Sequence, residues 1–374
     1  MSALVIIVWA IILSFFAIQI LALVALNDSR HGQKHEFDEW PMVSILLAAR
    51  NEEKLIIRSL KALDNIDYPI DKIEILIGDD DSDDRTSDLV KEFIKDKAKF
   101  SLHHITEIMG NGRGKANVLA HLAHKAKGEF YFVTDVDVKL PSAWVKDMLS
   151  GFEPKVGILS GTTMCERKSN LFAMLQSIDW LHFMGYIKSF ANWGIACTSV
   201  GNNMAVRAEA YWQTGGFEKI EFSITEDYKL FEAVTKAKWE WRTLLSADSL
   251  GKAHHIPNVL EMLHQRKRWL IGAKDLPLTW KSLIVLYGMF LPALLILAIM
   301  NLKMAFIVWA FKFFFQSIFI FGLTTKVKEK PFGLAKLLVY EVYVVLNTIS
   351  TAVFYFLPFA SKWKGRTYSK ANIA

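Results

Sequence analysis

Four long apolar stretches, one near the start of the chain and three near its end, constrain the fold most strongly. The first, Ala3–Leu26, contains only Ser14 and Gln19 as polar residues, and it is long enough to cross the hydrocarbon core of a bilayer. A cleaved secretory signal would have a basic start and an apolar core of about 7–15 residues, so an uncleaved anchor is predicted instead. The other three stretches are Ser282–Met300, Met304–Leu323 and Leu337–Phe359.

The basic residues beside these stretches predict their orientation. Arg30 and Lys34 follow the first stretch, and no charged residue precedes it. Because basic residues gather on the cytoplasmic side of membrane proteins, we expect the middle of the chain in the cytoplasm. The basic tail from Lys362 onward also has a cytoplasmic character, whereas three spans would place it on the opposite side. This conflict leaves open that one of the three C-terminal stretches is re-entrant or interfacial and does not span the membrane.

The net charge of +6 does not indicate a nucleic-acid partner. Much of the Lys and Arg lies beside the apolar stretches, where anionic headgroups attract it. Cys165 and Cys197 lack the spacing of a metal site, and in a cytosolic domain such cysteines are expected to be reduced and buried. The expected partner of the basic residues is therefore the membrane bilayer, and no nucleic acid is expected.

The middle of the chain alternates strand-like and helix-like segments. Short apolar runs predict strands at Met42–Ala49, Ile73–Ile77, Ser101–Ile108 and Glu129–Thr134. This alternation predicts an α/β fold with a mixed, mainly parallel sheet covered by helices, and such sheets bind ligands at the carboxyl ends of their strands. We expect four parts: an anchor with its linker (1–39), an α/β domain (40–257), an amphipathic interfacial segment (258–281) and C-terminal transmembrane helices with a basic tail (282–374).

Asp135 and Asp137 follow the last of these predicted strands. Two carboxylates at a strand end can face one site, and hard divalent cations such as Mg²⁺ or Mn²⁺ prefer oxygen ligands. A cation held there would neutralise a diphosphate leaving group. A solvated loop is the alternative for an isolated Asp-x-Asp, but the buried strand before it and the other motifs favour a metal–diphosphate site.

Asp79 and Asp80 end the second predicted strand in the same way. A carboxylate at this edge can accept hydrogen bonds from a base or from ribose hydroxyls. Lys115 ends the loop Gly110–Lys115, and glycine-rich loops can bind phosphates, although the spacing is not that of a Walker motif. We expect Asp79, Asp80 and Lys115 to contact a nucleotide, with a solvated basic loop as the alternative for Lys115.

Asp227 follows Thr225 and Glu226 at the predicted start of a helix. These residues can simply cap that helix, or Asp227 can act as a general base that deprotonates an acceptor hydroxyl. The other motifs favour the base. Glu226 is expected to contact the acceptor or sugar, and Gly201, Asn202 and Asn203 are expected to supply backbone and amide donors to the same groups.

Gln265, Arg268 and Trp269 bring an amide, a guanidinium and an indole onto one amphipathic segment. Arginine can pair with a diphosphate in bidentate fashion, and an indole offers a flat face to a sugar ring. A membrane-interface helix is the alternative, because arginine and tryptophan are common there, and both interpretations are compatible. His254 and His255 can supply a further metal contact, but a structural role is favoured.

As an ordered set, these motifs resemble the membrane-integrated branch of the family 2 glycosyltransferases. This resemblance implies a GT-A fold for the catalytic domain, with donor nucleotide contacts near Asp79 and Asp80. It implies metal and diphosphate binding by Asp135 and Asp137, with Asp137 favoured as the direct ligand. The segments that carry the resemblance are Val43–Glu53, Tyr68-Pro69, Asp79–Thr86, Asp135-Val136-Asp137, Thr225-Glu226-Asp227 and Gln265-x-x-Arg268-Trp269.

The resemblance also assigns roles to the later motifs. It implies that Asp227 is the base, and that Gln265, Arg268 and Trp269 close over the donor pyrophosphate and the end of the acceptor. The Gln-x-x-Arg-Trp form is similar to that of cellulose, hyaluronan and poly-N-acetylglucosamine synthases and of ceramide glucosyltransferase. One span before the catalytic domain and about three after it are closer to the lipid-glycosylating enzymes.

The expected function is therefore inverting transfer of a sugar from a nucleotide-diphosphate sugar to a hydroxyl of a membrane lipid or lipid-linked glycan. The resemblance favours UDP as the nucleotide, with GDP as the alternative. The expected location is a bacterial inner membrane, as a multi-pass protein with a cytoplasmic catalytic domain. A processive polysaccharide synthase that uses the same residues is the main alternative. A nucleotidyltransferase and a catalytically silent membrane scaffold are two others, but the first gives Asp227 no role and the second does not explain the full set of carboxylates.

Overall fold

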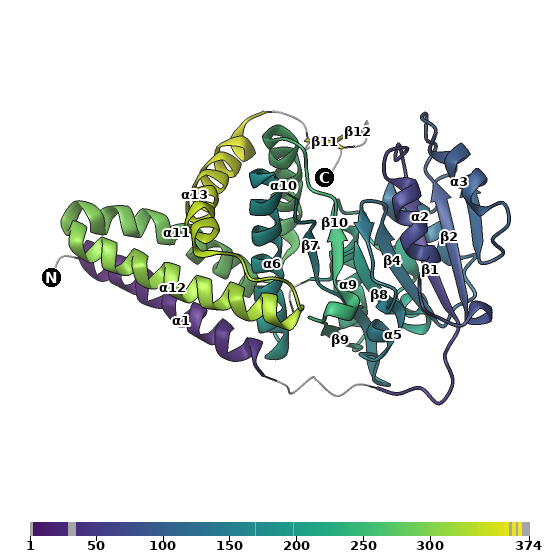
Figure 1. The fold of residues 1–374 in the computed structure, drawn as a ribbon, viewed down its shortest axis with the longest axis horizontal. Helices are drawn as coiled ribbons and strands as arrows, with labels where there is room; N and C mark the ends of the chain where they lie inside the picture. The colour runs from purple at the N-terminus through teal and green to yellow at the C-terminus, as the bar shows by residue number, and fades with distance from the viewer. Residues whose placement is uncertain are drawn as a thin grey trace. The chain divides into compact units, whose positions relative to one another are not determined.

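The chain divides into a sheet unit and a helical unit, each built from segments that are separate in the sequence (Figure 1). The sheet unit draws its residues from 31–166, 198–255 and 362–374, and the helical unit from 1–30, 167–197 and 256–361. The computed structural model describes residues 3–28, 35–168, 170–196, 198–358, 361–363 and 366–368. Arg30, Lys34 and Cys197 therefore lie outside the described residues, whereas Cys165 is buried, as expected.

The sheet unit contains a seven-stranded sheet in the order β3-β2-β1-β4-β8-β6-β9. Strands β1 to β4 run parallel to one another, β8 is antiparallel to both β4 and β6, and β9 is parallel to β6. The predicted mixed, mainly parallel sheet is confirmed. Its strands are β1 (Val43–Ala49), β2 (Ile73–Asp79), β3 (Phe100–His104), β4 (Phe130–Asp135), β6 (Val156–Ser160), β8 (Asn203–Arg207) and β9 (Glu240–Thr243).

A smaller three-stranded sheet, in the order β5-β10-β7, belongs to the same unit. It consists of β5 (Val138–Lys139), β7 (Thr163–Cys165) and β10 (Gly251–Ala253). Because β5 begins three residues after β4 ends, this sheet lies next to the Asp135–Asp137 segment. The sequence analysis identified the strands as far as β4 and none of those after it.

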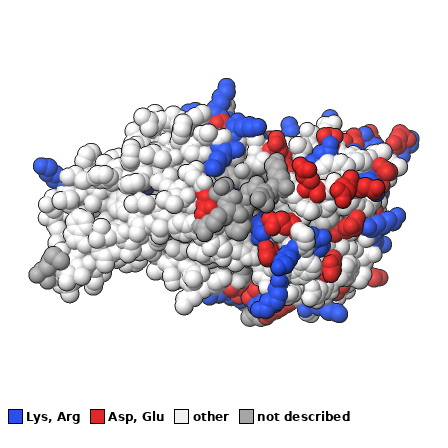
Figure 2. Space-filling model, turned by 90° about the horizontal axis from the view of Figure 1, so that it is seen from below, with Lys and Arg blue, Asp and Glu red and all other residues white. Residues whose placement is uncertain are grey.

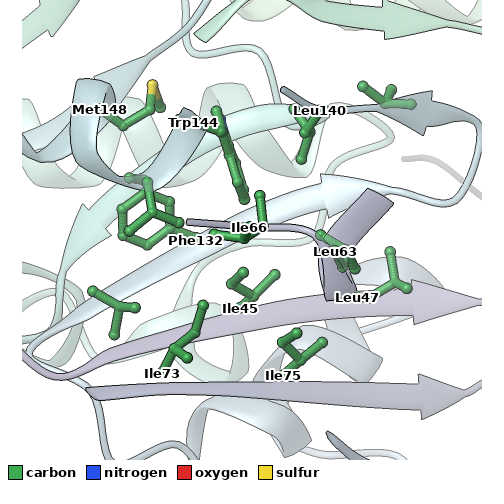
Figure 3. Close-up of a cluster of buried hydrophobic side chains, with 14 of the residues drawn as sticks. Ile45, Leu47, Leu63, Ile66, Ile73, Ile75, Phe132, Leu140, Trp144 and Met148 are labelled. Carbon is green, nitrogen blue, oxygen red and sulfur yellow. The ribbon is translucent and has the colours of Figure 1, made fainter. Parts of the chain in front are cut away.

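Helices cover the larger sheet because its central strands β1, β2 and β4 are buried along almost their whole length, on both faces. Alternate residues of β1, Ile45 and Leu47, face a cluster that helices α2 and α5 complete with Leu63, Trp144 and others (Figure 3). Helix α4 contacts β1 and β2 as well. The helices of this unit are α2 (Ile56–Asp64), α3 (Thr86–Ile94), α4 (Lys115–Ala123), α5 (Trp144–Leu149), α7 (Ala208–Gln213), α8 (Gly216–Lys219) and α9 (Glu226–Lys236), with short 3₁₀ turns η1 (Ile70–Lys72) and η2 (Ala247–Ser249).

The helical unit contains four helices that are long and apolar enough to cross a membrane, among the residues that the structure describes. They match the four predicted spans. One is near the N-terminus and three lie near the C-terminus, and the face of these helices seen in Figure 2 carries few charged side chains. They are α1 (Ala3–Leu26), α11 (Leu278–Met300), α12 (Leu302–Lys326) and α13 (Leu334–Phe356).

Two further helices complete this unit. Helix α10 (Val259–Gly272) carries the predicted amphipathic segment and leads through the turn η3 (Ala273–Asp275) to α11. Helix α6 (Leu171–Asn192) was not predicted, and it groups with the helical unit although its residues lie inside the expected 40–257 domain. The compact units thus differ from the expected domain boundaries in this segment. A pair of short strands, β11 (Ser361–Trp363) and β12 (Arg366–Tyr368), lies near the C-terminus.

Candidate active site

The parallel strands bring two of the acidic motifs to the same edge of the large sheet. Asp79 is the last residue of β2 and lies opposite Ala49 of β1, while Asp135 is the last residue of β4 and lies opposite Ala48. The two aspartates therefore end strands on either side of β1, at nearly the same level. Open α/β sheets bind their ligands at this carboxyl edge.

Lys115 contacts several of the predicted site residues at once. It is the first residue of α4, and Gly114 before it has a φ of 55°, which favours glycine. The Lys115 Nζ lies 2.5 Å from Asp135 Oδ1 and 3.2 Å from Glu226 Oε1. It also donates a hydrogen bond to the carbonyl oxygen of Gly201 at 3.3 Å. The structure thus brings together residues from α4, β4, α9 and the loop before β8.

The two carboxylates keep the Lys115 ammonium charged. Burial by itself lowers the pKa of Lys115, but the negative charges of Asp135 and Glu226 outweigh this effect and raise that pKa above its usual value. The result is a fixed positive charge at the carboxyl edge of the sheet. A preorganised cation of this kind is suited to stabilise negative charge that develops on a leaving diphosphate.

Asp227 is held in one orientation by two backbone groups. Its Oδ2 accepts a hydrogen bond from the Gly201 N–H at 2.8 Å, and its Oδ1 accepts one from the Tyr228 N–H at 2.8 Å. Thr225 precedes α9 at its N-cap, but its side chain makes no capping hydrogen bond. The capping interpretation therefore does not account for Thr225.

The surroundings of Asp227 raise its pKa to about 6. Burial is the largest cause, and the negative charge of Glu226 adds to it, whereas Lys115 and the two backbone N–H groups act in the opposite direction. A carboxylate that ionises near neutral pH combines a sufficient basicity with the deprotonated state that a base requires. Asp227 therefore has the electrostatic properties of a general base.

The segment Gly201–Asn203 divides into residues of different roles. Gly201 lies against Asp227, because a Cβ at this position would come within 2.9 Å of the Asp227 Cβ. Asn202 is partly exposed, and its Oδ1 accepts a hydrogen bond from Thr163 Oγ1 at 3.0 Å. The close approach of Gly201 explains why this position has no side chain.

The Asn203 side chain makes interior hydrogen bonds in the sheet unit, and its expected contact with a sugar or acceptor stays a prediction. Asn203 is fully buried (0% exposed). Its Oδ1 accepts from Trp144 Nε1 at 2.8 Å, and its Nδ2 donates to the carbonyl oxygens of Thr162 and Ser249, each at 2.9 Å. Because these interior bonds occupy the amide, the Asn203 side chain serves the packing of β8.

Asp79 and Asp80 lie at the carboxyl end of β2, as expected, but Asp79 is almost completely buried (1% exposed). Its Oδ2 lies 3.1 Å from His104 Nδ1, and its Oδ1 accepts a hydrogen bond from the Ser82 N–H at 3.3 Å. The Arg50 guanidinium donates to the Asp80 carbonyl oxygen. Contact of either carboxylate with a nucleotide stays a prediction.

The backbone of Asp137 is fixed by two elements from distant parts of the sequence. Its carbonyl oxygen accepts hydrogen bonds from Arg58 of α2 at 3.1 Å and from the His254 N–H at 2.8 Å. Arg58 also forms a salt bridge with Glu166, with 2.5 Å between Nη2 and Oε1. This bond involves only the backbone of His254, so the structural role favoured for its side chain stays a prediction.

The donor set at this edge fits a divalent cation that is shared with a substrate. Within the described ranges, no group of three or more His, Cys, Asp and Glu side chains is arranged to hold a metal alone. Magnesium sites commonly use one or two carboxylates and complete their shell with water and substrate phosphates. Asp135 and Asp137, with hard oxygen donors at the carboxyl edge of the sheet, match that type of site.

Gln265, Arg268 and Trp269 lie on α10, which belongs to the helical unit. The Trp269 ring contacts the Trp180 ring edge-to-face, with 5.3 Å between their centroids. The Arg266 guanidinium lies 4.6 Å from the centroid of the Trp269 ring. That these motif residues meet the donor and acceptor stays a prediction.

Two residues near the site were missed by the sequence analysis. Arg58 fixes the Asp137 backbone, and His104, at the carboxyl end of β3, lies beside Asp79. The position of His104 at a strand end was the one signal available, because parallel strands end at a common edge. Arg58 lies in the first turn of α2, where a charged side chain is ordinarily a solvated surface residue, so its sequence context gave no signal.

A comparison with known proteins relates this arrangement to established families. The family model described as "Glycosyl transferase family 21" matches residues 4–371. Beta-monoglucosyldiacylglycerol synthase from Nostoc sp. is 28% identical over 259 residues, which are 68% of this chain and 54% of that relative. Poly-beta-1,6-N-acetyl-D-glucosamine synthase from Staphylococcus epidermidis is 26% identical over 254 residues, 65% of this chain and 57% of that relative. The chain spans about half the length of these curated relatives.

A solved structure supports the fold assignment. The mannosyltransferase PcManGT from Pyrobaculum calidifontis, in complex with GDP-Man and Mn²⁺, matches with a TM-score of 0.50 and 17% sequence identity. The match covers 93% of this chain and 98% of that one. The expected GT-A architecture, with one long apolar helix before the catalytic segments and three after them, is thereby confirmed.

Proposed function

The chain belongs to glycosyl transferase family 21, and we propose that it is an inverting glycosyltransferase that acts on a membrane lipid or a lipid-linked glycan. The observation that carries this proposal is the cluster around Lys115. It joins Asp135, at the expected diphosphate edge, to the α9 segment that holds Asp227 with a pKa of about 6. The expected nucleotidyltransferase alternative has no use for Asp227 and does not agree with the family.

In this mechanism, an oxygen of the Asp227 carboxylate removes the proton from an acceptor hydroxyl. The hydroxyl oxygen forms a bond to the anomeric carbon, while the bond between that carbon and the diphosphate oxygen breaks on the opposite face. The configuration at the anomeric carbon is therefore inverted, and the diphosphate leaves with the electron pair. Gly201 and Tyr228 hold the Asp227 oxygens through their N–H groups during the proton transfer.

The leaving diphosphate requires positive charge. Asp135 and Asp137 would hold a divalent cation, Mg²⁺ or Mn²⁺, which when bound neutralises the diphosphate. Lys115 adds a fixed charge beside Asp135. We assign Arg268 to bidentate pairing with the diphosphate, with Gln265 and Trp269 at the sugar and the end of the acceptor. Asp80 and Asp79 are assigned to the nucleoside side of the donor, which is UDP-linked in this proposal.

The proposed lipid acceptor rests on the helical unit and on the relatives. In the part of the chain that the structure describes, four helices are long and apolar enough to cross a membrane, so a membrane-embedded acceptor is available to this chain by lateral diffusion. One relative is named for the synthesis of a glucosylated diacylglycerol. A cytoplasmic position for the sheet unit is supported by the distribution of basic residues, and a place in a bacterial inner membrane is part of the same proposal.

A processive polysaccharide synthase is the second candidate. The observation that favours it is the comparable similarity to poly-beta-1,6-N-acetyl-D-glucosamine synthase, at 26% identity. The two candidates use the same catalytic residues and differ in the product. A single transfer yields one small lipid product, whereas a processive enzyme yields a polymer that lengthens with time.

The test measures transfer from radiolabelled UDP- and GDP-sugars into membranes that contain the full chain, with Mn²⁺, Mg²⁺ or a chelator. Products are separated by organic extraction and by size. We expect one small organic-soluble band that disappears with the chelator. A high-molecular-weight smear that grows with time would support the polysaccharide synthase, and the absence of label with all donors would contradict both candidates.

The Asp227→Asn variant tests the assigned base. We expect kcat to fall by about 10²–10⁴-fold, because general base catalysis contributes on this scale. The matched control is Asp88→Asn, since Asp88 is an exposed aspartate of α3 with 79% of its side chain accessible. Near-normal transfer by a folded Asp227→Asn protein would exclude Asp227 as the base.

A further inference from the structure

Helix α6 presents one face to the segment that carries the Gln-x-x-Arg-Trp motif. Gln176, Asp179 and Trp180 are spaced i, i+3 and i+4, so they lie on one side of the helix. All three contact residues 256–269. Helix α6 and α10 belong to the same unit, and both are described in full between Leu171 and Asn192 and between Val259 and Gly272.

The three contacts fix this segment at its start and within the motif. The Gln176 side chain donates to the Ile256 carbonyl oxygen at 3.0 Å and accepts from the Ile256 N–H at 2.9 Å. Asp179 Oδ2 forms a salt bridge with the Arg266 guanidinium. Trp180 lies edge-to-face against Trp269, with centroids 5.3 Å apart. The contacts of Ile256, just before α10, and of Arg266 and Trp269, in its last two turns, together restrict rotation and translation of this helix.

The Asp179–Arg266 pair is the charged member of this set. Its side chains are only 19% and 16% exposed. The Tyr340 hydroxyl of α13 donates to Asp179 Oδ1 at 3.2 Å, so both carboxylate oxygens are engaged. The paired guanidinium also lies over the Trp269 ring at 4.6 Å. The carboxylate of Asp179 therefore orients Arg266, and Arg266 in turn packs on Trp269.

From this geometry we infer that Asp179 is a positioning residue for sugar transfer. It acts through Arg266 on the turn of α10 that carries Gln265, Arg268 and Trp269, and it does not itself contact a substrate. The inference rests on the proposed function, in which these three residues meet the donor diphosphate and the end of the acceptor. A helix that rotates or slides by a small distance would misplace all three groups together.

The kinetic test compares Asp179→Asn with the matched control Glu341→Gln in the full chain. Glu341 is also a buried carboxylate of the helical unit, but it pairs with Lys312 between α12 and α13. We expect Asp179→Asn to lower kcat/KM per folded protein by about 10- to 100-fold, the scale of a misplaced reacting group. Glu341→Gln should lower the thermal midpoint and leave kcat/KM unchanged. Equal kcat/KM losses in both variants, or none in Asp179→Asn, would overturn the inference.

A second readout does not depend on activity. We expect hydrogen exchange of peptides that cover residues 259–272 to become faster in Asp179→Asn and to stay unchanged in Glu341→Gln. Unchanged exchange of these peptides in Asp179→Asn would overturn the inference even if activity fell. Should the wild-type protein transfer no sugar, the proposed function would fail while this measurement still decides whether Asp179 positions α10.

A milder variant covers the case in which Asp179→Asn does not fold. Tyr340→Phe removes only the hydroxyl that donates to Asp179. We expect it to change kcat/KM and the exchange of residues 259–272 in the same direction as Asp179→Asn, by a smaller factor. Asp179→Glu keeps the charge and should restore part of the activity. No change in Tyr340→Phe together with no rescue by Asp179→Glu would contradict the positioning role.

Discussion

At the scale of single residues, the charge on Glu226 and the charge on Lys115 act in opposite directions on Asp227. Glu226 raises the pKa of Asp227 and Lys115 lowers it, while burial makes the largest contribution and raises it. The balance gives a pKa of about 6. One side chain that the sequence analysis assigned to the acceptor, Glu226, therefore also tunes the assigned base.

The pH dependence of the reaction follows from this balance. Below a pH of about 6 the Asp227 carboxyl is protonated and cannot accept a proton, so kcat/KM should fall as the pH decreases through about 6. Glu226→Gln removes one negative charge and should move this acidic limb to lower pH. The acidic limbs of the wild-type protein and of Glu226→Gln are both measured as kcat/KM between about pH 4 and 8. A wild-type limb near the pKa of an ordinary aspartate, or a limb that Glu226→Gln does not move, would contradict this assignment.

At the scale of elements, the site depends on a loop that meets the first turn of a helix. The loop before β8 contributes the Gly201 N–H and carbonyl group, and α9 contributes Glu226 and Asp227. Their approach is close because Gly201 has no Cβ. Lys115, from α4, bonds to both partners and so ties the loop and the helix to the sheet edge.

Gly201→Ala tests this close approach. The added Cβ would lie 2.9 Å from Asp227 Cβ and 3.1 Å from Asp227 Oδ2, so loop or helix must shift. We expect kcat to fall by about tenfold or more, since small displacements of a reacting group are costly. The measurement is kcat per folded protein. Gly288→Ala is the control, because a Cβ there meets no atom within 4 Å. Equal activity of the two variants would show that the site tolerates the shift.

At the scale of the whole molecule, the helical unit holds a pair of opposite charges in its interior, although the face of its long apolar helices seen in Figure 2 carries few charged side chains. Lys312 of α12 lies 2.6 Å from Glu341 of α13, and the side chains are each 8% exposed. Gln316 donates a further hydrogen bond to Glu341. Ionisable residues in apolar helices are paired because an isolated charge there is costly, and this pair joins two of the four long helices.

Removing one member of this pair should cost more than removing both. Lys312→Met leaves the Glu341 carboxylate buried without its cation, and we expect the free energy of unfolding to fall by about 3–5 kcal/mol. Lys312→Met combined with Glu341→Leu removes both charges and should recover most of that loss. Thermal unfolding of the detergent-solubilised wild-type, single-variant and double-variant proteins measures the loss of stability and its recovery. A double variant that is no more stable than Lys312→Met would contradict this prediction, because the unpaired Glu341 carboxylate would then not be the cause of the loss.

The sequence by itself determined the four long apolar helices, the first four strands and the carboxyl-edge position of Asp79 and Asp135. These features follow from local patterns, since apolar length and strand alternation are readable within one segment, and parallel strands share one edge. Helix α6 was not predicted, because a helix that is apolar around most of its circumference shows no clear helical period.

Only the tertiary structure decided which of the candidate residues meet. The contacts of Lys115 with Asp135, Glu226 and Gly201 join segments far apart in the chain, as does the contact of Asp179 with Arg266. No local sequence pattern could predict that Asn203 is buried and accepts a hydrogen bond from Trp144. The physical reason is that side-chain hydrogen bonds and burial depend on the packing of distant elements, whereas the sequence pattern reports only which face of its own element a residue occupies.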